Sequence, residues 1–181
     1  MAIKTFSDGN SLPASDINTY LTNSGLVYVT SATVGTAVAS VTVSSAFNST
    51  YDAYKIIATN VSASGSGTVA FALGGITTGW YGNLIYSNFL SGAVASFGWN
   101  NTASVTHAGG TQSQILILDT EIANPFLAKA KSMHSSFIDN ANAGSVIVQN
   151  NQATSATAFT ITPTTGTLTG GQITVYGYRK A

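Results

Sequence analysis

Short runs of alternating apolar and polar residues, separated by turn residues, follow one another from Leu26 to Tyr178. A period of two puts alternate side chains on opposite faces of a β-strand, so each run predicts a strand with one buried face. The connections are rich in Gly, Asn, Ser and Thr, which are the residues of antiparallel turns. We expect strands at residues 26–34, 36–43, 54–61, 68–73, 84–90, 93–99, 104–108, 114–121, 132–139, 146–149, 158–162 and 172–178.

The stretch 47–73 shows the pattern most clearly. Two alternating runs, 54–59 and 68–73, flank a turn rich in Ser and Gly at 62–67. Two such runs joined by a turn that contains Gly are typical of paired antiparallel strands. We therefore place this pair at the structural centre of the sheet, with Tyr51 and Tyr54 supplying large rings at its entry.

The closing run, 172–178, alternates as regularly. It places Ile173, Val175 and Gly177 on one face and Tyr176 and Tyr178 on the other. The preceding run, 158–162, ends at Pro163 and contains Phe159, which we assign to the core together with Ile161.

Many short strands with regular turn signals predict a sandwich or barrel. We expect an all-β fold, an antiparallel β-sandwich of jelly-roll type with a short N-terminal helical arm. The sandwich domain spans residues 26–181 and the arm residues 1–25.

The arm contains the only convincing helix pattern, at residues 13–23. Ile17, Tyr20 and Leu21 fall on one face of this helix, at positions i, i+3 and i+4. A helix of so few turns needs a surface on which to dock. That surface is either another protein, which makes the arm an assembly anchor, or one end of its own sandwich.

The charge content bounds the function. Charged residues make up 7% of the chain, six basic and six acidic, against about 25% in an average domain. Hydrophobic residues reach 44%, so the chain should fold. A neutral, hydroxyl-rich surface suits adhesins, extracellular assemblies and virus particles. It argues against nucleic-acid binding, which requires clustered Lys and Arg.

The sequence shows neither the pattern of a signal peptide nor that of a membrane span. The first residues lack the apolar core of a signal peptide, so we expect synthesis in a cytoplasm without export. No apolar run approaches the length of a membrane span, and we expect no membrane insertion. The chain has no cysteine, which excludes disulfides and zinc sites built on Cys.

Groups that could carry catalysis are sparse. His107 and His134 stand far apart and match no metal-ligand spacing. Asp119 and Glu121 share one strand face, about 6–7 Å apart, and a carboxylate pair of this kind serves some hydrolases or a calcium ion. Structural strands carry the same pairing. We predict no enzyme activity, no catalytic residue, no metal site and no cofactor.

Two aromatic stretches suggest a binding surface. Trp80 and Tyr81 lie between two glycines in a predicted loop and Asn83 follows them, and Trp99 and Asn100 repeat the same chemistry. Sugars stack on such rings and bond to such amides, so we predict that these five residues contact glycan. The alternative is that the aromatic residues fill the core or a subunit interface, where Trp and Tyr are enriched.

Several segments, taken in their order along the chain, resemble those of a known group of proteins. They are T-F-S-D-G-N-S-L-P-A-S-D-I-N-T-Y-L-T-N from Thr5, F-N-S-T-Y-D-A-Y-K-I-I from Phe47, V-A-F-A-L from Val69, A-N-P-F-L-A-K from Ala123, F-T-I-T-P from Phe159 and G-T-L-T-G-G-Q-I-T-V-Y-G-Y from Gly166. In this order they resemble the jelly-roll virion proteins of tailed bacteriophages, especially those of marine and cyanobacterial phages. The family often has Arg near the second segment, where this chain has Lys55.

The resemblance implies a virion component that is often trimeric, without catalytic residues. Two function classes fit it. In the first, the chain is an appendage module, a tail-fibre or receptor-binding component that attaches through its N-terminal arm and contacts host surface glycan. In the second, it is a decoration or cement protein that stabilises the capsid shell. The expected partners are two further copies of the chain, other virion proteins of tail or capsid, and host glycan.

Overall fold

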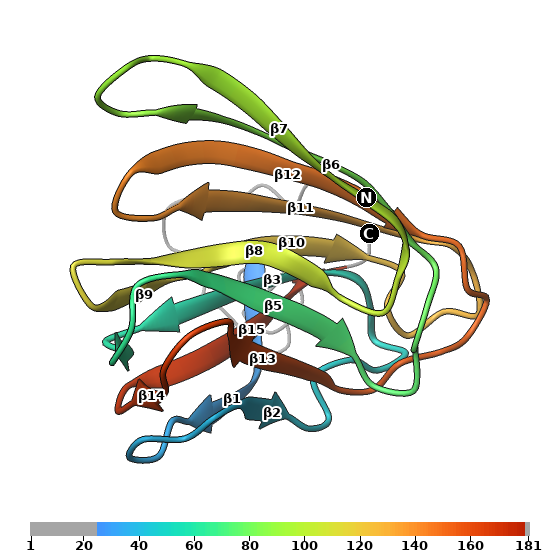
Figure 1. The fold of residues 1–181 in the computed structure, drawn as a ribbon. Coiled ribbons are helices and arrows are strands. Elements are labelled where there is room, and N and C mark those ends of the chain that lie inside the picture. The colour runs from blue at the N-terminus through green and yellow to red at the C-terminus, as the bar shows by residue number, and fades with distance from the viewer. Residues whose placement is uncertain (1–24, 180–181) are drawn as a thin grey trace, which may run out of the picture.

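A computed structural model describes residues 25–179, which form fifteen strands in two antiparallel sheets (Figure 1). The predicted all-β fold and its sandwich arrangement of antiparallel sheets are confirmed. The arm residues 1–24, with the predicted anchor residues Ile17, Tyr20 and Leu21, lie outside the described residues.

The first sheet has eight strands. In spatial order they are β1 (Leu26–Thr33), β15 (Gln172–Arg179), β3 (Tyr51–Thr59), β10 (Asp119–Ala123), β11 (Lys131–Ile138), β12 (Asn142–Asn150), β6 (Trp80–Asn88) and β7 (Val94–Thr102). The second sheet has seven strands. They are β14 (Leu168–Thr169), β4 (Ser62–Ala63), β9 (Ile115–Ile117), β8 (Val105–Gln112), β5 (Thr68–Leu73), β13 (Phe159–Pro163) and β2 (Val41–Val43).

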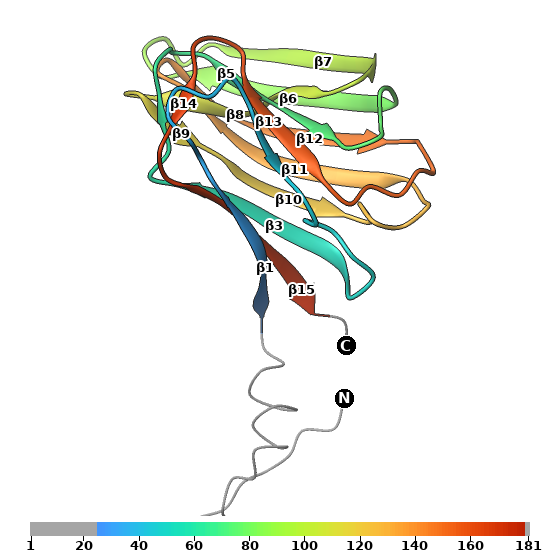
Figure 2. The same cartoon turned by 90° about the horizontal axis from the view of Figure 1, so that it is seen from below.

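The chain crosses between the sheets many times. β1, β3, β6–β7, β10–β12 and β15 belong to the first sheet, and the strands between them belong to the second. Figure 2 shows the two layers and shows β1 and β15 side by side at one end, where Leu26 pairs with Tyr178. The two ends of the described chain therefore lie close together.

One predicted pairing is wrong. The runs 54–59 and 68–73 are both strands, but β3 pairs with β10 and β15, whereas β5 pairs with β8 and β13 in the other sheet. The linker between them bonds to segments that are distant in sequence, since Ser64 N donates to Thr167 O and Gly67 N donates to Thr111 Oγ1 of β8. Alternation marks each run as a strand but does not encode which sheet it joins.

Several predicted strand ends are shifted, as in β6, β8 and β12. Two predicted strands differ by more than their ends. The run 36–43 forms a strand only at Val41–Val43, because Ala37 has a left-handed backbone with φ of 52°. The run 114–121 divides into β9 and β10, which lie in different sheets. The chain passes between the sheets at Leu118, which is buried.

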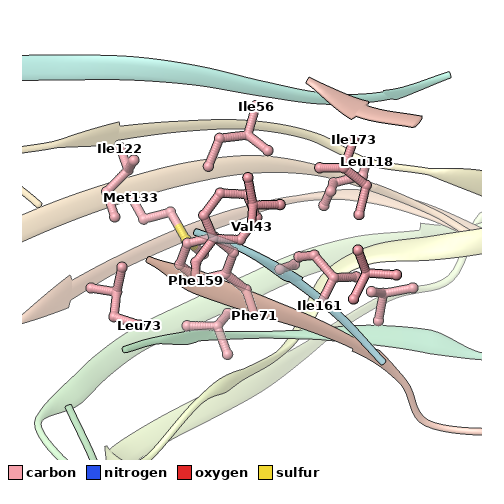
Figure 3. Close-up of a cluster of buried hydrophobic side chains, with 14 of the residues drawn as sticks. Val43, Ile56, Phe71, Leu73, Leu118, Ile122, Met133, Phe159, Ile161 and Ile173 are labelled. Carbon is pink, nitrogen blue, oxygen red and sulfur yellow. The ribbon is translucent and has the colours of Figure 1, made fainter. Parts of the chain in front are cut away.

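Alternate side chains of both sheets meet in one apolar core (Figure 3). Phe159 of β13 is fully buried and stacks on Phe71 of β5 with ring centroids 5.1 Å apart. It also contacts Phe47, which meets the ring of Tyr54 edge to face at 4.9 Å. The Tyr54 hydroxyl donates to Asn48 O, and burial raises the pKa of this phenol. The core assignments of Phe159 and Ile161 are confirmed.

The predicted faces of the closing strand are confirmed as well. Ile173, Val175 and Gly177 are buried, whereas Tyr176 and Tyr178 remain partly exposed. A Cβ atom on Gly177 would lie 2.3 Å from the ring of Tyr51, so this ring occupies the space that a side chain would need. The strand therefore presents its tyrosines to the outer face of the first sheet.

We expect Phe159→Ala to lower the free energy of unfolding by about 3–5 kcal/mol, because it removes a buried ring from between two sheets. Urea unfolding followed by fluorescence measures the change. Leu90→Ala is the control, since Leu90 is 98% exposed and its loss should cost about 0.5 kcal/mol or less. Equal losses in both variants would contradict the core assignment.

Candidate functional site

The outer face of the eight-stranded sheet presents the charged and polar side chains of the candidate site. The antiparallel registers place one residue of each strand in a single row across the sheet. From edge to edge the row contains Tyr28, Tyr176, Lys55, Glu121, His134, Ile147, Asn83 and Gly98. No segment among residues 25–179 forms a third layer over this face.

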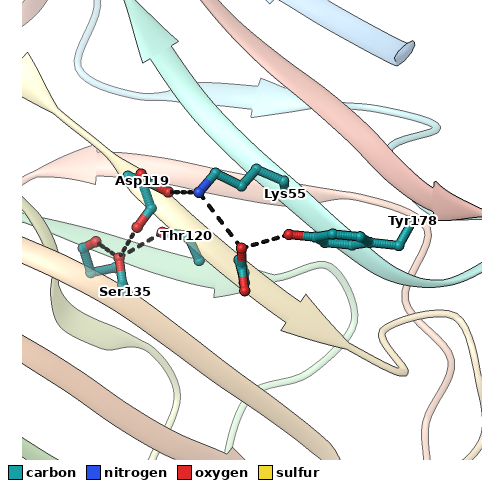
Figure 4. Close-up of polar contacts among 7 residues, drawn as sticks. Lys55, Asp119, Thr120, Ser135 and Tyr178 are labelled. Atoms are coloured by element: carbon teal, nitrogen blue, oxygen red, sulfur yellow. Dashed lines mark hydrogen bonds and ion pairs between the residues drawn. The ribbon is translucent and has the colours of Figure 1, made fainter. Parts of the chain in front are cut away.

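A compact charged group lies in the middle of this face (Figure 4). The ammonium of Lys55 is 2.6 Å from Asp119 Oδ1 and 3.6 Å from Glu121 Oε1. The Tyr178 hydroxyl donates to Glu121 Oε1 at 2.5 Å. β10 supplies both carboxylates because residues 119 and 121 share one strand face, as the sequence predicts.

The network shifts two pKa values. The hydrogen bond and charge of Asp119 raise the pKa of Lys55, since both favour the ammonium form. The hydrogen bond to Glu121 raises the pKa of Tyr178, because the carboxylate accepts from the protonated phenol. At neutral pH Lys55 is therefore an ammonium and Tyr178 keeps its hydroxyl proton.

His134 extends the polar row on the next strand. Its Nε2 lies 2.8 Å from Ser145 Oγ of β12. Glu121 pairs with His134 across β10 and β11. Within residues 25–179, no three His, Asp, Glu or Cys side chains are close enough together to hold a metal ion.

A shallow shelf lies beside this row, and its floor is made by small residues. Ala53, Ala123 and Ser132 are neighbours on β3, β10 and β11. Tyr178 bounds the shelf on β15, and Gln149 continues the line on β12. The depression formed over this floor has a volume of about 340 Å³ and is also lined by Glu121, His134 and Ile147.

A second depression, of about 450 Å³, continues the shelf toward β6. It shares Ser132, Ile147 and Val148 with the first and ends at Tyr81. β6 approaches β12 closely here because Gly82 has φ of +145°, and a Cβ at this position would lie 2.3 Å from the Ile147 carbonyl oxygen. The shelf thus runs across six strands, with a tyrosine at each end.

Two of the five predicted glycan residues are not available to a ligand. Trp80 begins β6 instead of standing in a loop, and its side chain is fully buried against Phe71. Trp99 is 5% exposed, and its Nε1 donates to Thr106 Oγ1. The prediction is wrong for both tryptophans because strand alternation turns these two rings inward, and the alternative that they fill the core holds.

The other three predicted residues lie on the outer face. Tyr81 pairs with Gln149 on one side and Asn100 on the other, and Asn83 follows Tyr81 on the same face. Asn83 and Asn100 are exposed, and Tyr81 is half-buried. These residues therefore gather at the β6–β7 end of the shelf.

Sequence reasoning missed Lys55, His134 and Tyr178 as members of the site. Each occupies the polar position of an alternating run, so its outward direction is encoded. Their proximity follows from the strand order β15-β3-β10-β11, in which β15 and β3 are far from β10 and β11 in sequence.

Comparisons with models of protein families, with curated proteins and with solved structures found no match. Among residues 25–179, none belongs to a helix that is long and apolar enough to cross a membrane.

We expect Lys55→Met to lower the free energy of unfolding at pH 7 by about 0.5–1 kcal/mol, as for an exposed ion pair. The raised pKa of Lys55 means that its contribution is complete below the ordinary value of 10.5 and is lost as the pH rises through the folded-state value. Urea unfolding should therefore show the same difference between the two proteins at pH 7 and pH 9, and a smaller difference at pH 11.

Lys129→Met is the matched control. Lys129 is exposed and its ammonium makes no ion pair within residues 25–179, so its loss should leave the stability unchanged at each pH. A difference for Lys55→Met that is undiminished between pH 9 and pH 11 would show that lost packing, and not the ion pair, is responsible.

Proposed function

We propose that this chain is a structural module of a bacteriophage virion, placed in an appendage that contacts carbohydrate on the host surface. The observation that carries this proposal is the outer face of the eight-stranded sheet, which no other segment of residues 25–179 covers. It presents hydroxyl, amide and aromatic side chains, and the charges of its central group are held in one network. The attachment through residues 1–25 belongs to the same proposal.

The low charge supports a role within an assembly. With six basic and six acidic residues, the chain has little of the repulsion by which soluble monomers stay apart. We propose that it is made in the host cytoplasm and functions in the virion. The order of segments that resembles phage jelly-roll proteins supports this assignment. We also propose that the sandwich is a jelly-roll variant, because its chain passes repeatedly between two antiparallel sheets.

One observation favours a second function, that of a capsid decoration or cement protein. The β6–β7 hairpin exposes Phe89, Leu90 and Val94, which are 51%, 98% and 73% exposed. Apolar groups gathered in this way mark protein interaction sites. A capsid shell under this corner would cover them.

The position of the chain on the particle separates these functions. Immunogold labelling of purified particles of the virus that encodes the chain should place the label at the tail or vertex. The fluorescent full chain should also bind host cells, and periodate oxidation of their glycans should abolish that binding. Label over the whole shell would support the cement function instead, and particles without label would contradict both.

We further propose that the chain forms a homotrimer. The edge strands of the large sheet, β1 and β7, contain no charged residue, and their outer backbone groups have no strand partner within residues 25–179. Because these edges lie at opposite ends of the sheet, pairing β7 of one copy with β1 of the next is head to tail. A head-to-tail contact closes into a ring when the rotation allows.

Light scattering of the full chain should give three times the chain mass of 18.5 kDa. Ser96→Lys places a charge on the β7 edge and should shift the protein toward the monomer. Thr162→Lys, on the internal strand β13, is the control and should leave the mass unchanged. A monomeric unchanged chain at high concentration would contradict the trimer.

A further inference from the structure

We propose that the shelf from Tyr178 to Tyr81 binds an uncharged oligosaccharide that lies across the strands. This inference rests on the proposed carbohydrate contact and adds its location and the class of its ligand. The proposed binding residues are no longer the two tryptophans, which are buried. They form a line on the outer face of the first sheet.

The dimensions of the shelf indicate an extended ligand. From β15 to β6 it spans five steps between neighbouring strands, which is about 24 Å at the usual strand spacing. The floor is flat because Ala53, Ala123 and Ser132 stand at successive positions of the register. A surface this open and shallow does not enclose a small molecule, whereas a chain of linked sugar rings would lie along it.

The polar groups of the shelf indicate hydroxyl-bearing rings. The side chains of Ser132 and Gln149 on the shelf, and of Asn83 beside its β6 end, have no hydrogen-bond partner among the described residues, so each can bond to a ligand. The tyrosine rings at the two ends offer apolar faces for the C–H groups of a sugar ring. Hydroxyl and amide side chains, which both donate and accept, match a polyol better than an apolar ligand.

The charges of the site set the ligand class. Lys55 lies between Asp119 and Glu121, so the group has one ammonium against two carboxylates. Glu121 lines the shelf, and an acidic sugar placed there would meet a like charge. The shelf therefore favours uncharged sugars, whose hydroxyl groups donate to the carboxylate.

A peptide is the weaker candidate for this surface. Peptides that bind to sheets usually add a strand at an edge, where backbone groups are open. The shelf lies on the face of internal strands, whose backbone groups are already paired on both sides. Recognition there depends on side chains, which is the situation of a glycan ligand.

Titration of the full chain with cellohexaose, maltohexaose and mannohexaose, followed by saturation-transfer NMR and calorimetry, tests the proposal. At least one uncharged hexasaccharide should bind, its monosaccharide should bind about tenfold more weakly or worse, and oligogalacturonate should not bind. Preference for oligogalacturonate would overturn the ligand class. Failure of all three hexasaccharides to bind would overturn the inference.

Ser132→Trp tests the location, because it places a large ring on the floor of the shelf. Binding should fall about tenfold or more. Thr162→Trp makes the same kind of change at an exposed strand position of the other sheet and should bind as the unchanged chain does. Equal binding by both variants would place the ligand elsewhere.

Tyr81→Ala and Glu121→Gln keep the inference testable if Ser132→Trp does not fold. Each should weaken binding of the hexasaccharide, Tyr81→Ala through the lost ring face and Glu121→Gln through the lost carboxylate. Undiminished binding in both would overturn the proposed location. The particle labelling described above does not depend on these variants, so failure of the shelf and failure of the virion assignment are distinguishable.

Discussion

Apolar contact between the two sheets determines which side chains of this protein face inward and which face outward. The rings of Phe47, Tyr54, Phe71 and Phe159 meet at centroid distances of 4.9–5.7 Å and join strands of both layers. Because side chains alternate along a strand, turning these rings inward determines which residues face outward. The outer face of the large sheet is thus a consequence of the core.

Several of the few charges of this chain are placed where they have partners, most of them on that outer face. Three of its charges, on Lys55, Asp119 and Glu121, form one network in the middle of the sheet. Another charge, on Lys131, is buried, and its ammonium donates to the carbonyl oxygens of Lys129 and Gln152. Burial lowers the pKa of this lysine. These charges form contacts within the chain, and most of the surface is neutral.

A neutral surface with two open sheet edges suits a protein that is stable inside an assembly. The edges β1 and β7 lie at opposite sides of the same sheet, and the shelf runs between them. Pairing at the edges would leave the shelf uncovered, since backbone groups point along the sheet and side chains point away from it. Assembly and glycan contact, as proposed here, therefore use different parts of one sheet.

The sequence by itself determined most of the strands and the two faces of the regular alternating runs. Alternation predicted that Phe159 and Ile161 are buried and that Tyr176 and Tyr178 face outward, and the structure confirms each. The same local pattern did not reveal that the runs at 54–59 and 68–73 lie in opposite sheets. It also did not reveal that Trp80 and Trp99 turn inward. For Trp80, the glycines at positions 79 and 82 suggested a loop.

Only the tertiary structure decided which strands are neighbours, and with them the site. Lys55 meets Glu121 and Tyr178 because β3 lies between β15 and β10, an order joined by long excursions through the other sheet. A strand's alternation is local, set by the backbone geometry of a few residues. Its partner is chosen by how the whole core packs, and this information is spread over the entire chain.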